Sequence, residues 1–377
     1  MKVNPFFKEI QGVFGFGCMR LPMKGEEVDK EQFCSMIDEF VEAGFNYFDT
    51  AHGYIDGKSE LAIGECLSSR YDRSKFLLAN KLTAPYFDSQ EDIRTFFEKQ
   101  LKWCQVEYFD FYLMHAQGKG CYPKFQECKA YETAFELKKE GKIRHVGLSF
   151  HDKPEVLDQI LTDHPDVEFV QIQFNYADYD DPSVDSWKVY EVCAKHKKPV
   201  IVMEPVKGGN LVKLPKEADD IMRELNSGSN ASIAIRYAAG FDQMMMVLSG
   251  MSDLDQLKDN VAAMKNFEPL NEEEQDAVVK VREMLKELQV VPCTSCHYCV
   301  EENHCPKGIK IPDMFEALNN LKVFENERMY GFYNKFLVNE KHAKASECIK
   351  CGKCEEVCPQ HIEIRKQLEE VAKTFEE

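Results

Sequence analysis

Apolar runs alternate with amphipathic stretches over the first two thirds of the chain. The runs are short, rich in β-branched and aromatic residues, and most are followed by polar and apolar residues at helical spacing. This pattern predicts eight strands, at residues 13–18, 47–49, 76–79, 109–114, 145–149, 169–173, 200–203 and 245–248.

The stretches between the runs predict helices. Residues 29–44, DKEQFCSMIDEFVEAG, end in Gly44, which is typical of a helix C-terminus. Residues 229–240, SNASIAIRYAAG, predict a helix that opens at Asn230 or Ser232. Residues 270–289, LNEEEQDAVVKVREMLKELQ, carry an acidic start and one apolar stripe, and they predict a further helix.

Eight strand–helix units within about 250 residues indicate a (β/α)8 TIM barrel, in the α/β class. The competing fold is a doubly wound sheet, which usually has a glycine-rich phosphate loop after its first strand. The first predicted strand here gives GFGCMR, with no third glycine and no helix start. The pattern therefore favours the barrel over residues 1–268, a connecting helix over 269–290, and a separate small domain over 291–377.

Composition and charge limit which partners and which cellular compartment we expect for this protein. The 377 residues carry a formal net charge of −18, which disfavours general nucleic-acid binding because phosphates are also negative. The first residues, MKVNPFFKEIQGVFG, lack the basic and apolar regions of a signal peptide, and we see no apolar run of about 18 residues that predicts a membrane helix. We therefore expect a cytoplasmic protein with no membrane segment, whose thiols stay reduced.

Single polar or charged residues stand at the ends of three consecutive predicted strands. Asp49 ends the second strand and Tyr54 follows in the loop, Lys81 comes directly after LLAN, and His115 directly after FYLM. In a TIM barrel the carboxyl ends of the strands form the active-site face. A strand-end Lys or Asp is also typical of a rim salt bridge, and a lone His of a satisfied core position. The four residues together, on successive units, favour a catalytic site.

These motifs resemble those of the aldo-keto reductases, over roughly residues 10–265. The resemblance rests on Asp49 and Tyr54 in FDTAHGY, Lys81 in NKL and His115 in LMHA. It implies reduction of an aldehyde or ketone by hydride from NADP(H) or NAD(H), with Tyr54 as general acid and His115 orienting the carbonyl. It also implies that Asp49 pairs with Lys81. The chemistry agrees, because an alkoxide needs a proton donor and an ammonium lowers a phenol pKa from about 10.

Later stretches extend the resemblance to the cofactor site. GLSFH resembles the segment whose serine, here Ser149, would hold the nicotinamide carboxamide, and QIQFN resembles the segment that supplies the cofactor-site glutamine, here Gln171. MEPVKGGNL and GMSDLDQLKDN resemble two cofactor loops. The chain departs at Met203, where the family often has an aromatic residue, and at Gly250 and Gln256, where many members grip a 2′-phosphate. NADP preference is therefore not implied. The implied cofactor residues are Gly17, Met19, Asp49, Ser149, Gln171, Met203, Pro205, Val206, Gly208, Gly250, Met251, Gln256, Asp259 and Asn260.

Eight of the 15 cysteines fall in two compact runs near the C-terminus. Cysteines three residues apart wrap a short turn, so that three thiolates face one cluster. CTSCH also matches a haem-attachment pattern, which leaves the second run unexplained, and zinc sites do not need the tripled spacing. The spacing favours two 4Fe-4S clusters over these metals and over disulfides. The runs are Cys293, Cys296, Cys299 and Cys305 before Pro306, and Cys348, Cys351, Cys354 and Cys358 before Pro359.

The cysteine runs resemble those of two-cluster ferredoxins, in which the cysteine before the proline ligates the opposite cluster. The resemblance implies one cluster on Cys293, Cys296, Cys299 and Cys358, and the other on Cys348, Cys351, Cys354 and Cys305. Between the runs lie 42 residues, 306–347, with helical patterns such as IPDMFEALNNLKVF, as in the α-helical ferredoxin type. A barrel followed by such a domain resembles an iron–sulfur subgroup of the aldo-keto reductases.

The two halves handle electrons differently. Nicotinamide gives a hydride, which carries two electrons, whereas a 4Fe-4S cluster takes one at a time, and no flavin fingerprint G-x-G-x-x-G stands in the sequence to bridge them. The clusters therefore serve an electron-transfer protein partner, sense redox state, or stabilise their domain. The main hypothesis is a carbonyl reductase with a small carbonyl or alcohol substrate. The alternative is a redox relay or sensor whose barrel binds cofactor but turns over little.

Overall fold

The computed structural model describes residues 4–293, 295–300, 305–358 and 360–377, so Pro359 of the second cysteine run lies outside the described residues. Contacts divide the chain into two compact units. The sequence-based limits of the two domains stay a prediction. Among the described residues, no helix combines the length and apolarity that crossing a membrane requires. The first unit is Met1–Asp180, Val184–Gly208 and Ser227–Glu272, and the second is Asp181–Ser183, Gly209–Asn226 and Glu273–Glu377.

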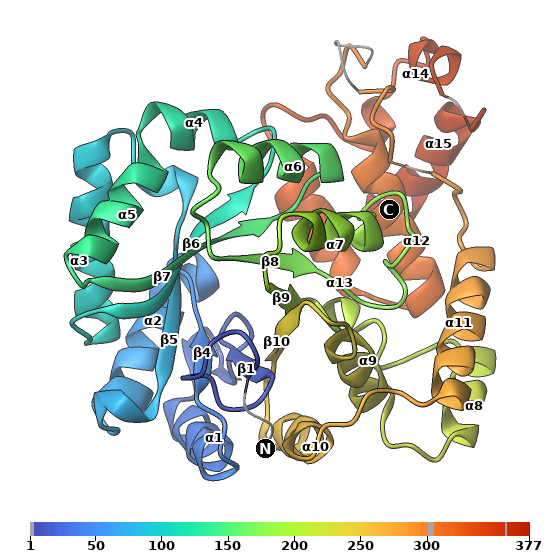
Figure 1. Ribbon diagram of the computed structural model, residues 1–377. Helices are drawn as coiled ribbons and strands as arrows, with labels where there is room; N and C mark the ends of the chain where they lie inside the picture. Colours follow the sequence, from blue (N-terminus) through green and yellow to red (C-terminus); the bar gives the residue numbers. More distant parts are fainter. Residues whose placement is uncertain (1–3, 294, 301–304, 359) are drawn as a thin grey trace. The chain divides into compact units, whose positions relative to one another are not determined.

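The first unit is a closed barrel of eight parallel strands with helices outside it (Figure 1). The ring closes because the first strand pairs with both the second and the last barrel strand. The predicted (β/α)8 fold is confirmed, and each predicted run overlaps one barrel strand. The strands are β1 (Phe14–Gly17), β4 (Tyr47–Asp49), β5 (Leu77–Leu82), β6 (Phe109–Gln117), β7 (Ile143–Phe150), β8 (Phe169–Gln173), β9 (Val200–Met203) and β10 (Met244–Gly250). A short hairpin, β2 (Met23–Lys24) and β3 (Glu27–Val28), follows β1.

The alternation of side chains along each strand sorts the core into two layers. On β6, Phe111 and Leu113 belong to a cluster inside the barrel, while Tyr112 and Met114 pack in the layer under the surrounding helices. Because successive side chains point to opposite faces, the inward row of β6 continues to His115 at the barrel mouth. The same alternation puts Asp49, Lys81, Ser149, Gln171 and Met203 on the inward side of their strands.

Capping residues set the ends of the helices around the barrel. The Asp29 side chain caps α1 (Lys30–Glu42), and Gly44 follows the last turn with a φ of 97°. The helix predicted to open at Asn230 or Ser232 begins at Asn230, as α9 (Asn230–Ala239), and the Ser229 hydroxyl caps it by accepting the Ser232 N–H. The other helices of this unit are α2 (Lys58–Ile63), α3 (Gln90–Cys104), α4 (Tyr122–Glu127), α5 (Ala130–Lys139), α6 (Pro154–Asp163), α7 (Ser186–Lys195) and α10 (Leu254–Lys265).

The second unit is helical, and its core lies between α12 (Ile311–Phe324) and α15 (Ile364–Phe375), where Phe315 and Leu368 are buried. The helix expected from IPDMFEALNNLKVF is confirmed. Asn319 on α12 accepts the Val290 and Val291 N–H groups at 2.9 Å each and donates to the Val291 carbonyl at 2.8 Å. This fixes the chain just before Cys293. The remaining helices are α8 (Lys216–Glu224), α11 (Glu272–Glu287), α13 (Arg328–Phe332) and α14 (Lys353–Glu356).

Candidate active site and cysteine cavities

The four predicted catalytic residues meet at the mouth of the barrel, at the ends of β4, β5 and β6 and in the loop after β4. The Lys81 ammonium donates to Asp49 Oδ1 at 2.5 Å and to the Thr50 carbonyl at 2.8 Å, and both charged side chains are buried. The Tyr54 ring centroid lies 4.8 Å from Lys81 Nζ and 6.1 Å from the centroid of the His115 ring. The fold thus brings together one anion, one ammonium, one phenol and one imidazole.

Burial and charge act against each other on Tyr54. Burial raises the pKa of the phenol above its usual value of 10.0, and the Lys81 ammonium opposes this rise only in part. The sequence-based expectation of a net lowered pKa is therefore wrong, because the effect of burial is the larger one. Burial also acts to lower the pKa of Lys81, but the Asp49 carboxylate and Tyr54 outweigh it, so the pKa of Lys81 is raised and the amine stays charged.

His115 is held as a neutral ring. Burial, then the Lys81 charge and nearby His151, keeps the pKa of His115 well below its usual 6.5. Its Nδ1 lies 2.7 Å from Thr83 Oγ1. When the threonine hydroxyl donates to Nδ1, the ring proton resides on Nε2, where it is available to a carbonyl oxygen.

Ser149 on β7 and Gln171 on β8 are neighbours in register and both are buried. Ser149 Oγ accepts the Ala116 N–H at 2.8 Å, which leaves the hydroxyl proton to donate elsewhere. Gln171 Oε1 is buried and has no hydrogen-bond partner among the described residues. An unpaired buried amide oxygen is costly. The pair therefore fits a carboxamide, which both donates and accepts hydrogen bonds.

The predicted glycines and the residues after β9 line the same mouth. Gly17 at the end of β1 is paired in register with Gly250 at the end of β10. Met203 ends β9, and the loop that follows contains Pro205, Val206 and Gly208. Met19 is 57% exposed, whereas the Met251 side chain is fully buried in the core, so a ligand would meet only the backbone of Met251.

The three predicted residues on α10 are engaged in hydrogen bonds within the protein. Gln256 Oε1 accepts the Ser252 N–H at 3.0 Å, so this side chain caps its own helix. Asp259 Oδ2 accepts from the Ser229 hydroxyl at 2.5 Å, and Asn260 donates to Ser249 Oγ at 3.1 Å. These bonds hold α10 in place. A cofactor bound at these positions would contact side chains that already form these hydrogen bonds.

Sequence reasoning missed polar residues at the same mouth. Gln173 at the end of β8 hydrogen-bonds His151, which follows β7, and Glu204, which follows β9. The alternation of side chains along a strand could have indicated them. His151 and Gln173 stand two residues beyond Ser149 and Gln171, so they point to the same inward side. The barrel mouth is therefore polar on the β7–β9 side.

Arg20, just after β1, was also missed. A Cβ at Gly250 would lie 3.4 Å from Arg20 Cβ, and a Cβ at Gly208 would lie 3.4 Å from its Nη2 atom. The side chain therefore runs from the last barrel strand to the loop after β9, and both glycines leave room for it. Ser252 Oγ donates to the Arg20 carbonyl at 3.2 Å, which joins the β1 and β10 loops.

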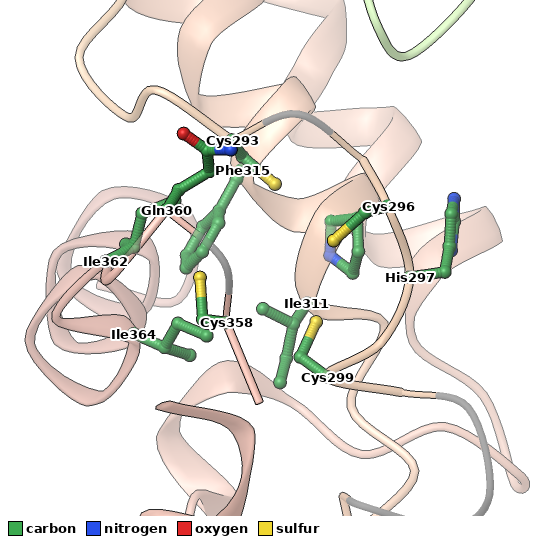
Figure 2. A pocket seen from close by; sticks show the side chains of 11 residues that line it. Cys293, Cys296, His297, Cys299, Ile311, Phe315, Cys358, Gln360, Ile362 and Ile364 are labelled. Carbon is green, nitrogen blue, oxygen red and sulfur yellow. The ribbon is translucent and has the colours of Figure 1, made fainter. Parts of the chain in front are cut away.

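The cysteines of the second unit line two cavities. Figure 2 shows the first, in which the sulfur atoms of four cysteines face a common space. Its apolar walls include Ile311, Phe315 and Ile364. The structure thus groups the three cysteines of the first run with the last cysteine of the second run, Cys293, Cys296, Cys299 and Cys358.

The second cavity groups the thiols in the complementary way, Cys348, Cys351 and Cys354 with Cys305. Ile311 lines both cavities, so the two sites share an apolar wall residue. Within the described residues, no three His, Cys, Asp or Glu side chains are placed to hold a single metal ion. The thiols instead line a small space in each case. Groups of four soft thiolates around a volume fit iron–sulfur clusters.

Comparison with known proteins gives matches to both regions. Residues 13–283 match the model of the aldo/keto reductase family, and residues 292–363 match that of the 4Fe-4S dicluster domain. The uncharacterized oxidoreductase YqkF of Bacillus subtilis is 27% identical over 291 residues, which cover 69% of this chain and 89% of that protein. L-galactose dehydrogenase of Arabidopsis thaliana is 26% identical over 277 residues, which cover 68% of this chain and 85% of that protein.

Solved structures match the barrel. Aldo-keto reductase AKR11C1 from Bacillus halodurans, in its holo form, aligns with a TM-score of 0.59 at 28% identity, covering 71% of this chain and 91% of that one. An aldo-keto reductase from Klebsiella pneumoniae in complex with NADPH shares the fold at 20% identity and a TM-score of 0.59, covering 72% of this chain and 90% of that one. The first family model alone spans most of the chain. The protein belongs to the aldo/keto reductase family and carries a C-terminal 4Fe-4S dicluster domain.

Proposed function

We propose that the protein is an NAD(P)H-dependent oxidoreductase that reduces an aldehyde or ketone, or oxidises the corresponding alcohol. The observation that carries the proposal is the buried Lys81–Asp49 pair with Tyr54 on one side, the Tyr54 ring centroid being 4.8 Å from the ammonium. A phenol beside a fixed ammonium, next to a neutral imidazole, is an arrangement suited to protonating a carbonyl oxygen.

Each of the four residues has its own role. Tyr54 donates its proton to the carbonyl oxygen, or takes a proton from the alcohol in the reverse direction. Lys81 stabilises the phenolate that this leaves, and Asp49 keeps Lys81 charged and in place at 2.5 Å. His115 donates from Nε2 to the same oxygen and orients it.

The cofactor residues define where the dinucleotide binds. Bound nicotinamide supplies or accepts the hydride. Ser149 and Gln171 hold its carboxamide, for which the unpaired Gln171 Oε1 is the supporting observation. Gly17, Gly250, Arg20 and the loop after β9 hold the phosphates. We propose that the dinucleotide is NADP(H) or NAD(H), and the aldo/keto reductase family match over residues 13–283 supports this.

We propose that each cysteine cavity holds one 4Fe-4S cluster, the first on Cys293, Cys296, Cys299 and Cys358 and the second on Cys305, Cys348, Cys351 and Cys354. The support is the pairing of three thiols from one run with one thiol from the other in both cavities. We propose that the clusters exchange single electrons with a partner protein and stay outside the path of the hydride.

The test is anaerobic purification with iron and sulfide analysis, followed by a panel of aldehydes and ketones with NADPH and NADH. We expect carbonyl-dependent oxidation of the cofactor that Tyr54→Phe lowers by about 100-fold or more, the usual contribution of a general acid. Tyr176→Phe is the matched control, because the Tyr176 hydroxyl is also buried but has no partner among the described residues. Tight NADPH binding without turnover of any carbonyl would instead favour a redox relay.

A further inference from the structure

A buried polar cluster lies on the outer side of the barrel wall, directly behind Lys81. Glu60 on α2 is fully buried, although carboxylates rarely are unless they are paired. Asn80, on the outward side of β5, Gln100 on α3 and Tyr112 on β6 are fully buried as well. None of the four belongs to the predicted catalytic or cofactor residues.

One oxygen of Glu60 holds the loop that carries Tyr54. Glu60 Oε2 lies 2.6 Å from Nδ1 of His52, two residues before Tyr54. The His52 ring stacks on Trp103 with centroids 4.5 Å apart and an interplanar angle of 14°, so its orientation is fixed. Ser59, the residue before Glu60, also ties α2 to the segment that precedes Tyr54, because Ser59 Oγ and Thr50 Oγ1 are 2.8 Å apart.

The other oxygen of Glu60 holds the strand that carries Lys81. Glu60 Oε1 accepts from Asn80 Nδ2 at 2.8 Å and from Gln100 Nε2 at 3.1 Å. These two amides bind the Lys81 backbone on both sides, because the Lys81 N–H donates to Asn80 Oδ1 at 2.8 Å and its carbonyl accepts from Gln100 at 3.1 Å. Tyr112 fixes the Gln100 amide by donating to its Oε1 at 2.6 Å.

We propose that Glu60 is a positioning residue that sets the separation of the Tyr54 phenol and the Lys81 ammonium, by joining His52 on one side to the Lys81 peptide on the other. This inference rests on the proposed function. Glu60 acts through other residues, since its buried carboxylate is bonded to the outward-facing Asn80 and to Gln100 on α3, behind the barrel wall. Small displacements of catalytic groups cost large factors in rate, so the effect belongs to the chemical step and not to cofactor binding.

The experiment compares Glu60→Ala with Glu60→Gln in the full chain purified without oxygen. Glu60→Ala is expected to lower the single-turnover rate of carbonyl reduction at least tenfold, with the Kd for NADPH, measured by fluorescence, unchanged. Glu60→Gln should retain most of the rate, because its amide oxygen accepts from Asn80 and Gln100 and its amide N–H donates to Nδ1 of the other His52 tautomer. In a Lys81→Met background, the effect of Glu60→Ala should largely disappear.

Asp110→Ala is the matched control. Asp110 is also fully buried and accepts from Arg73, Arg144 and the Leu78 N–H, but it lies near the amino end of β6, away from the mouth. It should lower stability and leave the rate per folded molecule unchanged. If Glu60→Ala does not fold, Gln100→Met, which removes the bond to the Lys81 carbonyl, should lower the rate with the Kd for NADPH unchanged.

Several results would overturn the inference: a wild-type rate in Glu60→Ala, a Gln variant as slow as the Ala variant, or full additivity with Lys81→Met. A slow Asp110→Ala enzyme would also overturn it, because the loss would then follow burial alone. If the proposed function itself were wrong, the wild-type protein would reduce no carbonyl, and this result can be distinguished from a failure of the Glu60 inference. Activity that is lost in Tyr54→Phe and kept in Glu60→Ala refutes only the role of Glu60.

Discussion

At the scale of single residues, the decisive property is the protonation state of Tyr54. Burial raises the pKa of this phenol, and Lys81 limits the rise. The phenol is therefore protonated at neutral pH and is ready to act as an acid. The same shift makes the phenolate scarce, so we expect the proposed reverse reaction, which needs a base, to be limited by how much phenolate Lys81 can stabilise.

The pKa direction predicts opposite pH profiles for the two reactions. Reduction uses the phenol, so kcat/KM should stay level from about pH 6 to about pH 9 and fall only as pH rises through the raised pKa, above about 10. Oxidation uses the phenolate and should rise with pH over the same range. Lys81→Met removes the opposing ammonium and raises the pKa of Tyr54 further. The fall in the reduction rate and the rise in the oxidation rate should therefore both move to higher pH. A reduction rate that falls between about pH 6 and about pH 8 would show that another acid is at work.

The sequence was informative about residues at strand ends and uninformative about their surroundings. Asp49, Lys81 and His115 could be found because each interrupts an apolar run at a predictable place. The net pKa of Tyr54 could not be found, since it depends on burial that only the folded mouth creates. The bonds of Glu60 were also hidden, because its partners Asn80 and Gln100 are 20 and 40 residues away.

At the scale of elements, the connection from β4 to α2 places Tyr54, the proposed general acid. Ile55 and Asp56 have φ values of 51° and 53°, and Gly57 follows with 83°, so three consecutive residues are left-handed. This conformation is rare for a β-branched residue and is typical of functional turns. It returns the chain sharply enough for Ser59 and Glu60 to reach the residues just before Tyr54.

Gly57→Ala is expected to disturb this turn. The added Cβ would lie 3.3 Å from His52 Cε1, and the left-handed backbone alone costs about 1 kcal/mol for alanine. We predict a lower midpoint of chemical denaturation together with slower carbonyl reduction. Gly120→Ala is the control, because nothing lies within 4 Å of the site of its Cβ. Equal behaviour of the two variants would show that the turn does not constrain Tyr54.

The elements themselves were largely predictable. All eight strands could be predicted from apolar runs, because parallel barrel strands are buried on both faces and so consist mostly of consecutive apolar residues. The start of α9 was predicted only as Asn230 or Ser232, because Ser229, Asn230 and Ser232 are all good caps and only the backbone geometry selects Ser229 as the cap.

At the scale of the whole molecule, an aldo/keto reductase barrel and a 4Fe-4S dicluster domain share one chain. The family match covers residues 13–283 and the cluster match residues 292–363. The crossed grouping of thiols, which spacing alone leaves open and the ferredoxin resemblance implies, is also what the two cavities display. It makes the two cluster sites depend on each other's segments, so that neither run completes a site alone.

Single cysteine variants test the crossed grouping. Cys305→Ser should lower iron content and leave Cys348, Cys351 and Cys354 open to alkylation, while Cys293, Cys296 and Cys299 stay protected. Cys358→Ser should do the reverse. Peptide mapping after alkylation of the native protein, purified without oxygen, reads this out. Cys121→Ser is the control, because Cys121 lies in the barrel unit and lines neither cavity. Exposure of Cys293 to Cys299 in Cys305→Ser would mean that each run holds its own cluster.

The central claim, direct hydride transfer in the barrel, is tested most directly with NADPH deuterated at both C4 positions. The carbonyl substrate that gives the highest turnover is reduced under anaerobic conditions, and the alcohol is analysed by mass spectrometry. The account predicts one deuterium on the former carbonyl carbon, and a rate that Tyr54→Phe lowers without changing where the label goes. An alcohol whose new carbon-bound hydrogen comes from the solvent would contradict the account, because the electrons would then have left the nicotinamide without the hydride.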